Sequence, residues 1–175
     1  MRAILPPSPP MPFAIVTGAP ASGKSSVVRA LLAQRPDFLV FDADRLLDAA
    51  SELCGRSVAV ESELWPPCRI IWLTFLRLIA DNGRLPVLFM PLEPRELPPS
   101  WQASVRWCLL DCDEATRRLR LRARDWQPAV IDEAIADAVA LRQQIAEVID
   151  TSQQEPESVA TLLTAWLFRS SELRE

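Results

Sequence analysis

Short apolar runs alternate with longer segments of helical periodicity along this chain. The first run, Phe13-Ala14-Ile15-Val16-Thr17, is mostly apolar and partly β-branched, which is typical of a strand buried on both faces. Four similar runs follow, at residues 38–41, 86–90, 105–110 and 148–149. Helical patterns occupy residues 23–34, 44–54, 66–81, 113–124, 129–147 and 156–169. This alternation predicts an α/β fold in three layers, with a five-stranded parallel sheet covered by helices on both faces.

The turn after the first run has a sequence of its own. Gly18-Ala19-Pro20-Ala21-Ser22-Gly23-Lys24-Ser25 matches the phosphate-loop pattern G-x-x-x-x-G-K-[ST] at every fixed position. In such a loop the backbone N–H groups and the N-terminus of the following helix surround an anion. We therefore expect ATP to bind at residues 18–26, with Lys24 on the β- and γ-phosphates and the Ser25 hydroxyl on Mg²⁺. The alternative is an ordinary glycine-containing turn between a strand and a helix.

Composition strengthens the first interpretation. Lys24 is the only lysine, whereas the other 18 basic residues are arginines, so a compact ammonium is retained only at the loop. The chain has no histidine and no tyrosine, which excludes Ser-His-Asp and Cys-His mechanisms and any imidazole base. A second lysine for the guanine-reading Asn-Lys-x-Asp motif of small GTPases is also missing. A proton acceptor must therefore be a carboxylate or water.

Length and charge limit the number of domains and the kinds of partner. The 175 residues predict a single domain over 13–170, preceded by an extended proline-rich arm at 1–12. No apolar run is long enough to span a membrane, and the net charge of −4 disfavours a nucleic-acid surface. The four cysteines lack metal-site spacing and are expected to be reduced core thiols of a cytoplasmic protein. They are Cys54, Cys68, Cys108 and Cys112.

Carboxylates follow the second predicted strand. In open parallel sheets the ligand lies at the carboxyl ends of the strands, where Asp42-Ala43-Asp44 would project. We expect Asp42 to serve Mg²⁺ and Asp44 to contact the phosphoryl acceptor. A solvated helix cap at Asp44 is the alternative. The acidic residue expected directly after the third strand is missing, because that strand runs into Pro91. This makes Asp42 the stronger candidate for the acid on the magnesium side, and Asp111 and Asp150 are the next candidates.

An arginine-rich segment follows the fourth strand. Arg120 and Arg124 are four residues apart and are expected to share one helical face, from which they would clamp phosphates. We expect the other arginines of this run to be solvated or paired with Asp113 and Glu114; they are Arg117, Arg118 and Arg122. The segment 117–130 would form a short lid, in which Trp126 either shields the nucleotide or packs at a hinge.

These motifs resemble those of the small P-loop kinases, a group that includes adenylate, shikimate and gluconate kinases and chloramphenicol phosphotransferase. The resemblance covers roughly residues 13–168 and implies the P-loop NTPase fold with ATP and Mg²⁺ as cofactors. It implies that Lys24, Asp42, Asp44, Arg120 and Arg124 are the catalytic residues, and that Thr151 and Ser152 border the adenine. The sequence after the third strand, Pro91-Leu92-Glu93-Pro94-Arg95, departs from the subfamily signatures, so the acceptor does not carry over.

The acceptor side is expected to be a helical insertion at about residues 46–82 together with the loop 91–99. Arg45, Arg69 and Arg95 are candidates to bind an anionic acceptor, with ordinary ion pairs as the alternative for the last two. Trp65 and Trp72 are expected to belong to the core rather than to an aromatic pocket.

The leading hypothesis is an ATP-dependent phosphotransferase acting on a small-molecule hydroxyl or phosphate, as a monomer or homodimer. The alternatives are an ATP-binding or ATP-hydrolysing regulatory module and a polynucleotide 5′-end kinase, which would need a basic single-strand channel.

Overall fold

The computed structural model describes residues 13–102 and 105–169, and the predicted proline-rich arm lies outside this range. Five parallel strands form one sheet in the order β2-β3-β1-β4-β5. The strands are β1 (Phe13–Thr17), β2 (Leu39–Asp42), β3 (Pro86–Phe89), β4 (Val105–Asp111) and β5 (Val148–Asp150). The predicted strands and their parallel arrangement are confirmed.

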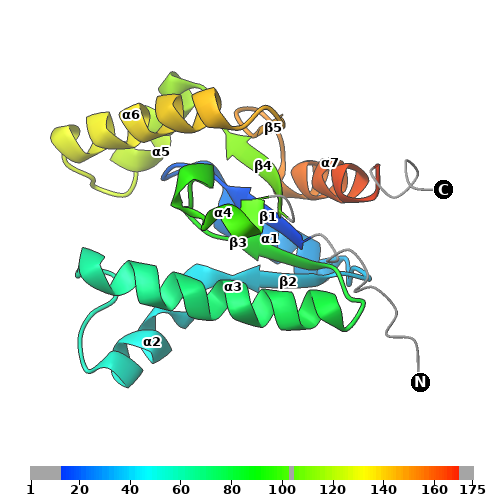
Figure 1. The fold of residues 1–175 in the computed structure, drawn as a ribbon. Helices are drawn as coiled ribbons and strands as arrows, with labels where there is room; N and C mark the ends of the chain where they lie inside the picture. The colour runs from blue at the N-terminus through cyan, green and yellow to red at the C-terminus, as the bar shows by residue number, and fades with distance from the viewer. Residues whose placement is uncertain (1–12, 103–104, 170–175) are drawn as a thin grey trace, which may run out of the picture.

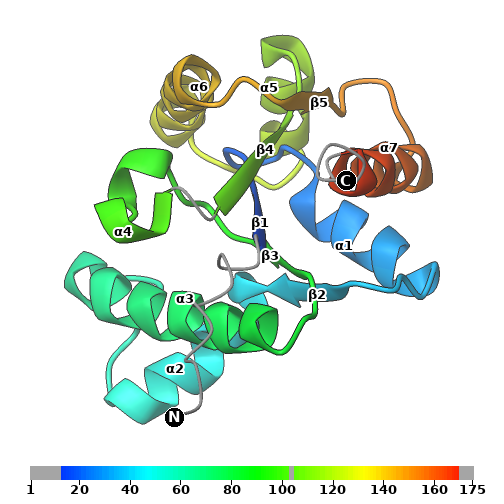
Figure 2. The same cartoon turned by 45° about the vertical axis from the view of Figure 1, so that its right-hand side comes forward.

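Helices cover both faces of the sheet (Figures 1 and 2). Their bounds are α1 (Lys24–Ala33), α2 (Leu47–Cys54), α3 (Trp65–Asp81), α4 (Pro99–Gln102), α5 (Glu114–Arg122), α6 (Pro128–Gln144) and α7 (Pro156–Phe168). Prolines occupy the first turns of α3, α6 and α7, where their missing N–H costs no hydrogen bond. No helix among these combines the length and apolarity needed to cross a membrane.

Side-chain alternation along the strands divides the core. Ala14 and Val16 of β1 point to the face covered by α1 and α7, where Leu31 and Leu163 are fully buried. Phe13 and Ile15 point to the opposite face, against α3. Helix α6 packs on that second face over β4. The central strands are thus buried on both sides, which explains why their sequences are continuously apolar.

Short helical segments between β2 and β4 were not predicted. The 3-10 helix η1 (Ala43–Leu46) begins directly after β2, and η2 (Ser62–Leu64) precedes α3. The 3-10 helix η3 (Pro94–Glu96) and the four-residue α4 lie between β3 and β4. Each is too short for a hydrophobic period to appear in sequence.

One cysteine departs from the expected core position. Cys68, Cys108 and Cys112 are buried free thiols, but Cys54 at the last position of α2 is exposed. Helix α2 buries no residue completely, so its end contributes little to the core.

An arginine of β4 connects α7 to the sheet. Arg106 of β4 donates from Nη1 to the Leu167 carbonyl at 2.7 Å and from Nη2 to the Trp166 carbonyl at 2.8 Å. Its guanidinium also lies 4.4 Å from the centre of the Trp166 ring. The last turn of a helix leaves carbonyls without intrahelical partners, and this side chain satisfies two of them.

We predict that Arg106→Met lowers the free energy of unfolding by about 2 kcal/mol, because two hydrogen bonds to a charged donor and a cation–π contact are lost. Urea unfolding monitored by circular dichroism measures this. Arg122→Met, at an exposed position of α5, is the matched control and should change stability by less than about 0.5 kcal/mol. Equal effects of the two substitutions would contradict the role given to Arg106.

Candidate functional site

The loop between β1 and α1 requires glycine at two positions for different reasons. A Cβ at Gly18 would lie 2.4 Å from the Leu110 carbonyl oxygen, so only glycine lets the loop start so close to β4. Gly23 has φ of 92°, in the left-handed region that favours glycine, and it caps α1. Ala21 also has a positive φ of 64°, and its buried methyl packs with Leu121 of α5. That contact offsets a local strain of about 1–2 kcal/mol.

Three consecutive carbonyl groups of the loop, those of Pro20, Ala21 and Ser22, are held from outside the loop by side chains of two other segments. Arg117 of α5 donates to the Pro20 carbonyl, and Arg120 donates to the Ala21 carbonyl at 3.1 Å. Thr151, after β5, donates its hydroxyl to the Ser22 carbonyl at 2.9 Å. The amides of Gly23, Lys24 and Ser25, where α1 begins, donate to no acceptor in residues 13–102 and 105–169, because the first N–H groups of a helix have no intrahelical partner. Unpaired N–H groups at a helix N-terminus form an anion-binding site.

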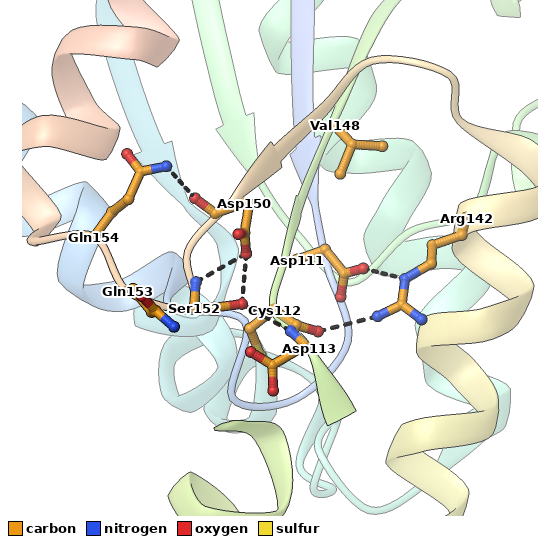
Figure 3. A pocket seen from close by; sticks show the side chains of 9 residues that line it. All are labelled: Asp111, Cys112, Asp113, Arg142, Val148, Asp150, Ser152, Gln153 and Gln154. Carbon is orange, nitrogen blue, oxygen red and sulfur yellow. Dashed lines mark hydrogen bonds and ion pairs between the residues drawn. The ribbon is translucent and has the colours of Figure 1, made fainter. Parts of the chain in front are cut away.

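Arg117 corrects the prediction that it lies on a solvated face. Its side chain is only 1% exposed and forms an ion pair with Asp111 at the end of β4, while Arg142 of α6 binds the other oxygen of the same carboxylate. Figure 3 shows Asp111 and Arg142 in the wall of a cavity of about 600 Å³ on this side of the sheet. A carboxylate shared by two guanidiniums can be buried because its charge is fully compensated. The helical pattern alone did not reveal this arrangement.

Two adjoining cavities open at the loop. One of about 240 Å³ is lined by the loop residues Pro20 to Ser26 and also by Asp44, Pro91 and Arg124. The other, of about 280 Å³, is lined by Arg120, Arg124, Thr151 and the start of α7, including Pro156. The two cavities share Ala21, Gly23, Ser26 and Arg124 in their walls, so they adjoin between the loop and Thr151.

Lys24 lies folded back inside this loop. Its ammonium donates to the Gly18 carbonyl, and it lies 3.5 Å from the Ala19 carbonyl oxygen. Burial lowers the pKa of Lys24 from 10.5 to about 8, with Arg117 and Arg124 acting in the same direction, while the carboxylates of Asp44 and Asp42 oppose the shift. An incoming anion would restore the charged form, because it supplies the compensation that the loop lacks.

Asp42 and Asp44 lie together at the end of β2. Asp42 is the N-cap of η1 and accepts from the Asp44 amide at 3.2 Å, so the cap is Asp42 rather than Asp44. Partial burial, and then the charge of Asp44, raise the pKa of Asp42. Asp44 itself lines the loop cavity. A cation held between the two carboxylates would relieve their repulsion.

Arg120 and Arg124 both reach the cavities, although not from one helical face. Helix α5 ends at Arg122, and Arg124 lies in the following turn. Arg120 donates to the Thr151 carbonyl at 2.6 Å as well as to the loop, whereas Arg124 borders both cavities. Arg118 pairs with Glu114, as expected, and also with Asp132 on the surface. Arg122 is exposed, as expected. Trp126 packs with Leu121 and Ile131, which favours the hinge interpretation.

The other predicted site residues lie outside these cavities. Ser152 lines the cavity of Figure 3, where its hydroxyl donates to Asp150 Oδ1 and accepts from the Asp113 amide, and it lines neither of the two loop cavities. Arg45 is exposed in η1. Arg69 pairs with Glu96 and Arg95 with Glu93, so the ion-pair alternative describes both. Trp65, the first residue of α3, is partly buried and packs against the core. No group of three or more metal-ligating side chains occurs in the described residues.

Comparison with solved structures places the fold. A sugar kinase from Janibacter sp. HTCC2649 superimposes with a TM-score of 0.60 at 19% identity, covering 90% of this chain and 95% of the kinase. Shikimate kinase from Aquifex aeolicus gives 0.60 at 13% identity, with 93% and 99% covered. The Deinococcus radiodurans tunicamycin resistance protein gives 0.62 at 20% identity, with 90% and 95% covered.

The chain has the fold of the small P-loop kinases. No protein-family model and no curated sequence matches it, so the likeness lies in the structure and in the loop motif. The buried ion pair between Arg117 and Asp111 was not predicted from the sequence. Their signal was an acidic residue at a strand end six positions before an arginine in the next helix.

We predict that Asp111→Asn lowers the free energy of unfolding by about 3 kcal/mol or more, because two guanidiniums lose their shared counter-charge, one of them fully buried. Chemical denaturation measures the loss. Asp132→Asn, which removes a partner of Arg118 from the surface, is the matched control and should cost less than about 1 kcal/mol. A tolerated Asp111→Asn would show that the loop does not depend on this network.

Proposed function

We propose that this protein is an ATP-dependent phosphotransferase that moves the γ-phosphoryl group of ATP to a small-molecule hydroxyl. The observation that carries the proposal is the set of three unpaired amides, Gly23 to Ser25, which meet the Lys24 ammonium in one cavity. This combination of backbone donors and a compact cation fits the β- and γ-phosphates of a nucleotide. The adjoining cavity beside Arg120 and Thr151 has room for the nucleoside.

Each residue then has a separate role. Lys24 would bind the β- and γ-phosphates, and the exposed Ser25 hydroxyl and the Asp42 carboxylate would hold Mg²⁺. Magnesium supplies charge neutralisation and a fixed orientation of the phosphates. Asp44, in the wall of the loop cavity, would accept a hydrogen bond from the attacking hydroxyl and then its proton.

The arginines complete the proposed site. Arg124 borders both cavities and would stabilise charge on the transferred group, while Arg120 would bind the nucleotide from its position between the loop and Thr151. Such electrostatic help at the transferred group commonly contributes several kcal/mol to lowering the barrier, about 3–4 kcal/mol for one donor.

An acceptor-dependent ATP-consumption assay tests the function. We expect ADP formation to rise at least tenfold when a suitable alcohol is added, and Lys24→Met to abolish this rise. ATP hydrolysis that no added alcohol stimulates, in a screen of sugars, nucleosides and aminoglycoside-like compounds, would contradict the kinase proposal and favour an ATP-switched binding module.

Lys24 makes nucleotide affinity depend on pH in a defined direction. The folded, ligand-free chain binds the proton of the Lys24 ammonium less tightly than the unfolded chain does. The cost of burying the charged lysine therefore decreases, and the stability of the fold rises, as pH rises from about 8 to 10.5. Phosphate binding requires the charged form. We therefore predict that ADP affinity, measured by calorimetry, is level below about pH 8 and falls above it by up to about tenfold per pH unit. Lys24→Met should bind ADP weakly and show no such fall in affinity above pH 8. If the affinities of the two proteins changed with pH in the same way, this would contradict the assignment.

Arg124→Ala should reduce phosphoryl transfer at least tenfold, equivalent to about 1.4 kcal/mol in the barrier, with a smaller change in ADP affinity. Arg120→Ala should weaken binding of ATP and ADP alike, because its contacts are to the loop and to Thr151. Arg122→Ala, two residues away and exposed, is the control and should leave both constants unchanged. Steady-state kinetics and calorimetry separate these outcomes; an unchanged rate in Arg124→Ala would remove Arg124 from the mechanism.

A further inference from the structure

The acceptor must approach the loop cavity past two residues that do not belong to the loop. Asp44 and Pro91 line this cavity together with the phosphate loop and Arg124. Asp44 lies in η1, which opens the helical segment between β2 and β3, and Pro91 opens the loop that carries η3. The charges of these two segments therefore decide which molecules can be phosphorylated.

Three arginines of these segments are each paired with a carboxylate. Arg69 is 14% exposed and pairs with Glu96, with 2.8 Å between Nη2 and Oε1, and it also donates to the Glu96 carbonyl at 3.3 Å. Arg95 pairs with Glu93. Further along, Arg56 pairs with Glu61 and Glu63. An anion would have to displace a carboxylate at each of these arginines.

The carboxylates that hold Arg69 and Arg95 are fixed in place by other contacts. Glu93 and Glu96 form a capping box around η3, in which the Glu93 amide donates to Glu96 Oε2 at 2.8 Å. Gln144 of α6 donates to Glu93 Oε2 at 2.9 Å. Since each carboxylate has several partners, these ion pairs are part of the local fold and are not easily exchanged for a ligand.

Asp42 and Asp44 add negative charge at the same place. Neither carboxylate forms an ion pair in the part of the chain that the structure describes, and each raises the pKa of Lys24 through its charge. The cations that do face the cavity, Lys24 and Arg124, lie where the phosphates of ATP would bind. Arg45 is the remaining nearby cation, and it is exposed to solvent. The residues along the approach of an acceptor therefore carry more negative than positive charge.

We propose that the phosphoryl acceptor is a small alcohol without negative charge, either neutral or amino-substituted, and that sugar acids and nucleotides are poor acceptors. This inference rests on the proposed kinase function. In the reaction the acceptor oxygen forms a bond to the γ-phosphorus, the bond from that phosphorus to the β,γ-bridging oxygen breaks, and ADP leaves. The hydroxyl proton passes to Asp44 and then to water. An acceptor that carries an amino group gains from the same carboxylates that repel an anion.

The test uses the full chain with γ-labelled ATP and a deproteinised small-molecule cell extract, separated beforehand on an anion exchanger. We expect at least ten times more label transfer to compounds of the unretained fraction than to those of the retained, anionic fraction. Lys24→Met is the blank. Greater transfer to the retained fraction would overturn the inference while the kinase function stands. No transfer to either fraction, with ATP binding intact, would overturn the kinase function and the inference with it.

A variant pair tests the cause of the preference. Glu93→Gln leaves Arg95, whose side chain is 73% exposed, without its carboxylate partner. We expect the ratio of kcat/KM for an anionic acceptor to that for its neutral analogue, such as gluconate against glucose, to rise at least threefold, with the KM for ATP unchanged. Glu61→Gln, which removes a partner of Arg56, should leave the ratio as it is. A ratio that does not respond to Glu93→Gln would refute the role of this ion pair.

Discussion

The site depends on the anchors that hold three consecutive carbonyl groups, those of Pro20, Ala21 and Ser22. With these carbonyls held, the loop leads into α1 so that the unpaired amides of Gly23, Lys24 and Ser25 lie in the wall of the loop cavity. Arg117, Arg120 and Thr151 provide these anchors from α5 and from the loop after β5. The phosphate loop is therefore held by residues that lie between 97 and 129 positions further along the chain.

Much of this fold is evident from the sequence because the signals are local. The β1 run and the loop after it fix their own conformations, since continuous apolar residues favour a doubly buried strand and Gly23 permits a positive φ. Asp113 caps α5, where it accepts from the Thr116 amide at 2.7 Å, and an aspartate directly before a helical segment is a local signal for such a cap. The prolines at the first turns of α3 and α7 also mark boundaries that the structure confirms.

Features that depend on distant partners were not evident. An arginine in an arginine-rich helix is usually solvated. Burial of Arg117 is favourable only because its guanidinium forms an ion pair with Asp111, the last residue of β4. Arg124 reaches the cavity because α5 ends early at Arg122, not because of helical spacing. Similarly, nothing in the order of residues distinguishes Arg69 as a ligand for an anion from Arg69 as the partner of Glu96. Charge type can be read from a sequence, but charge pairing requires the fold.

The solitary lysine has a consequence for how the protein can be observed. Apart from the terminal α-amino group, Lys24 is the only amine of the chain, and with a pKa of about 8 roughly a tenth of it is an uncharged nucleophile at pH 7. Acylating reagents, which modify many lysines in an ordinary protein, have only one side-chain amine here, and it lies inside the phosphate loop. An occupied loop would hold that amine protonated and covered, so the rate of its acylation becomes a direct measure of how much of the protein carries a nucleotide.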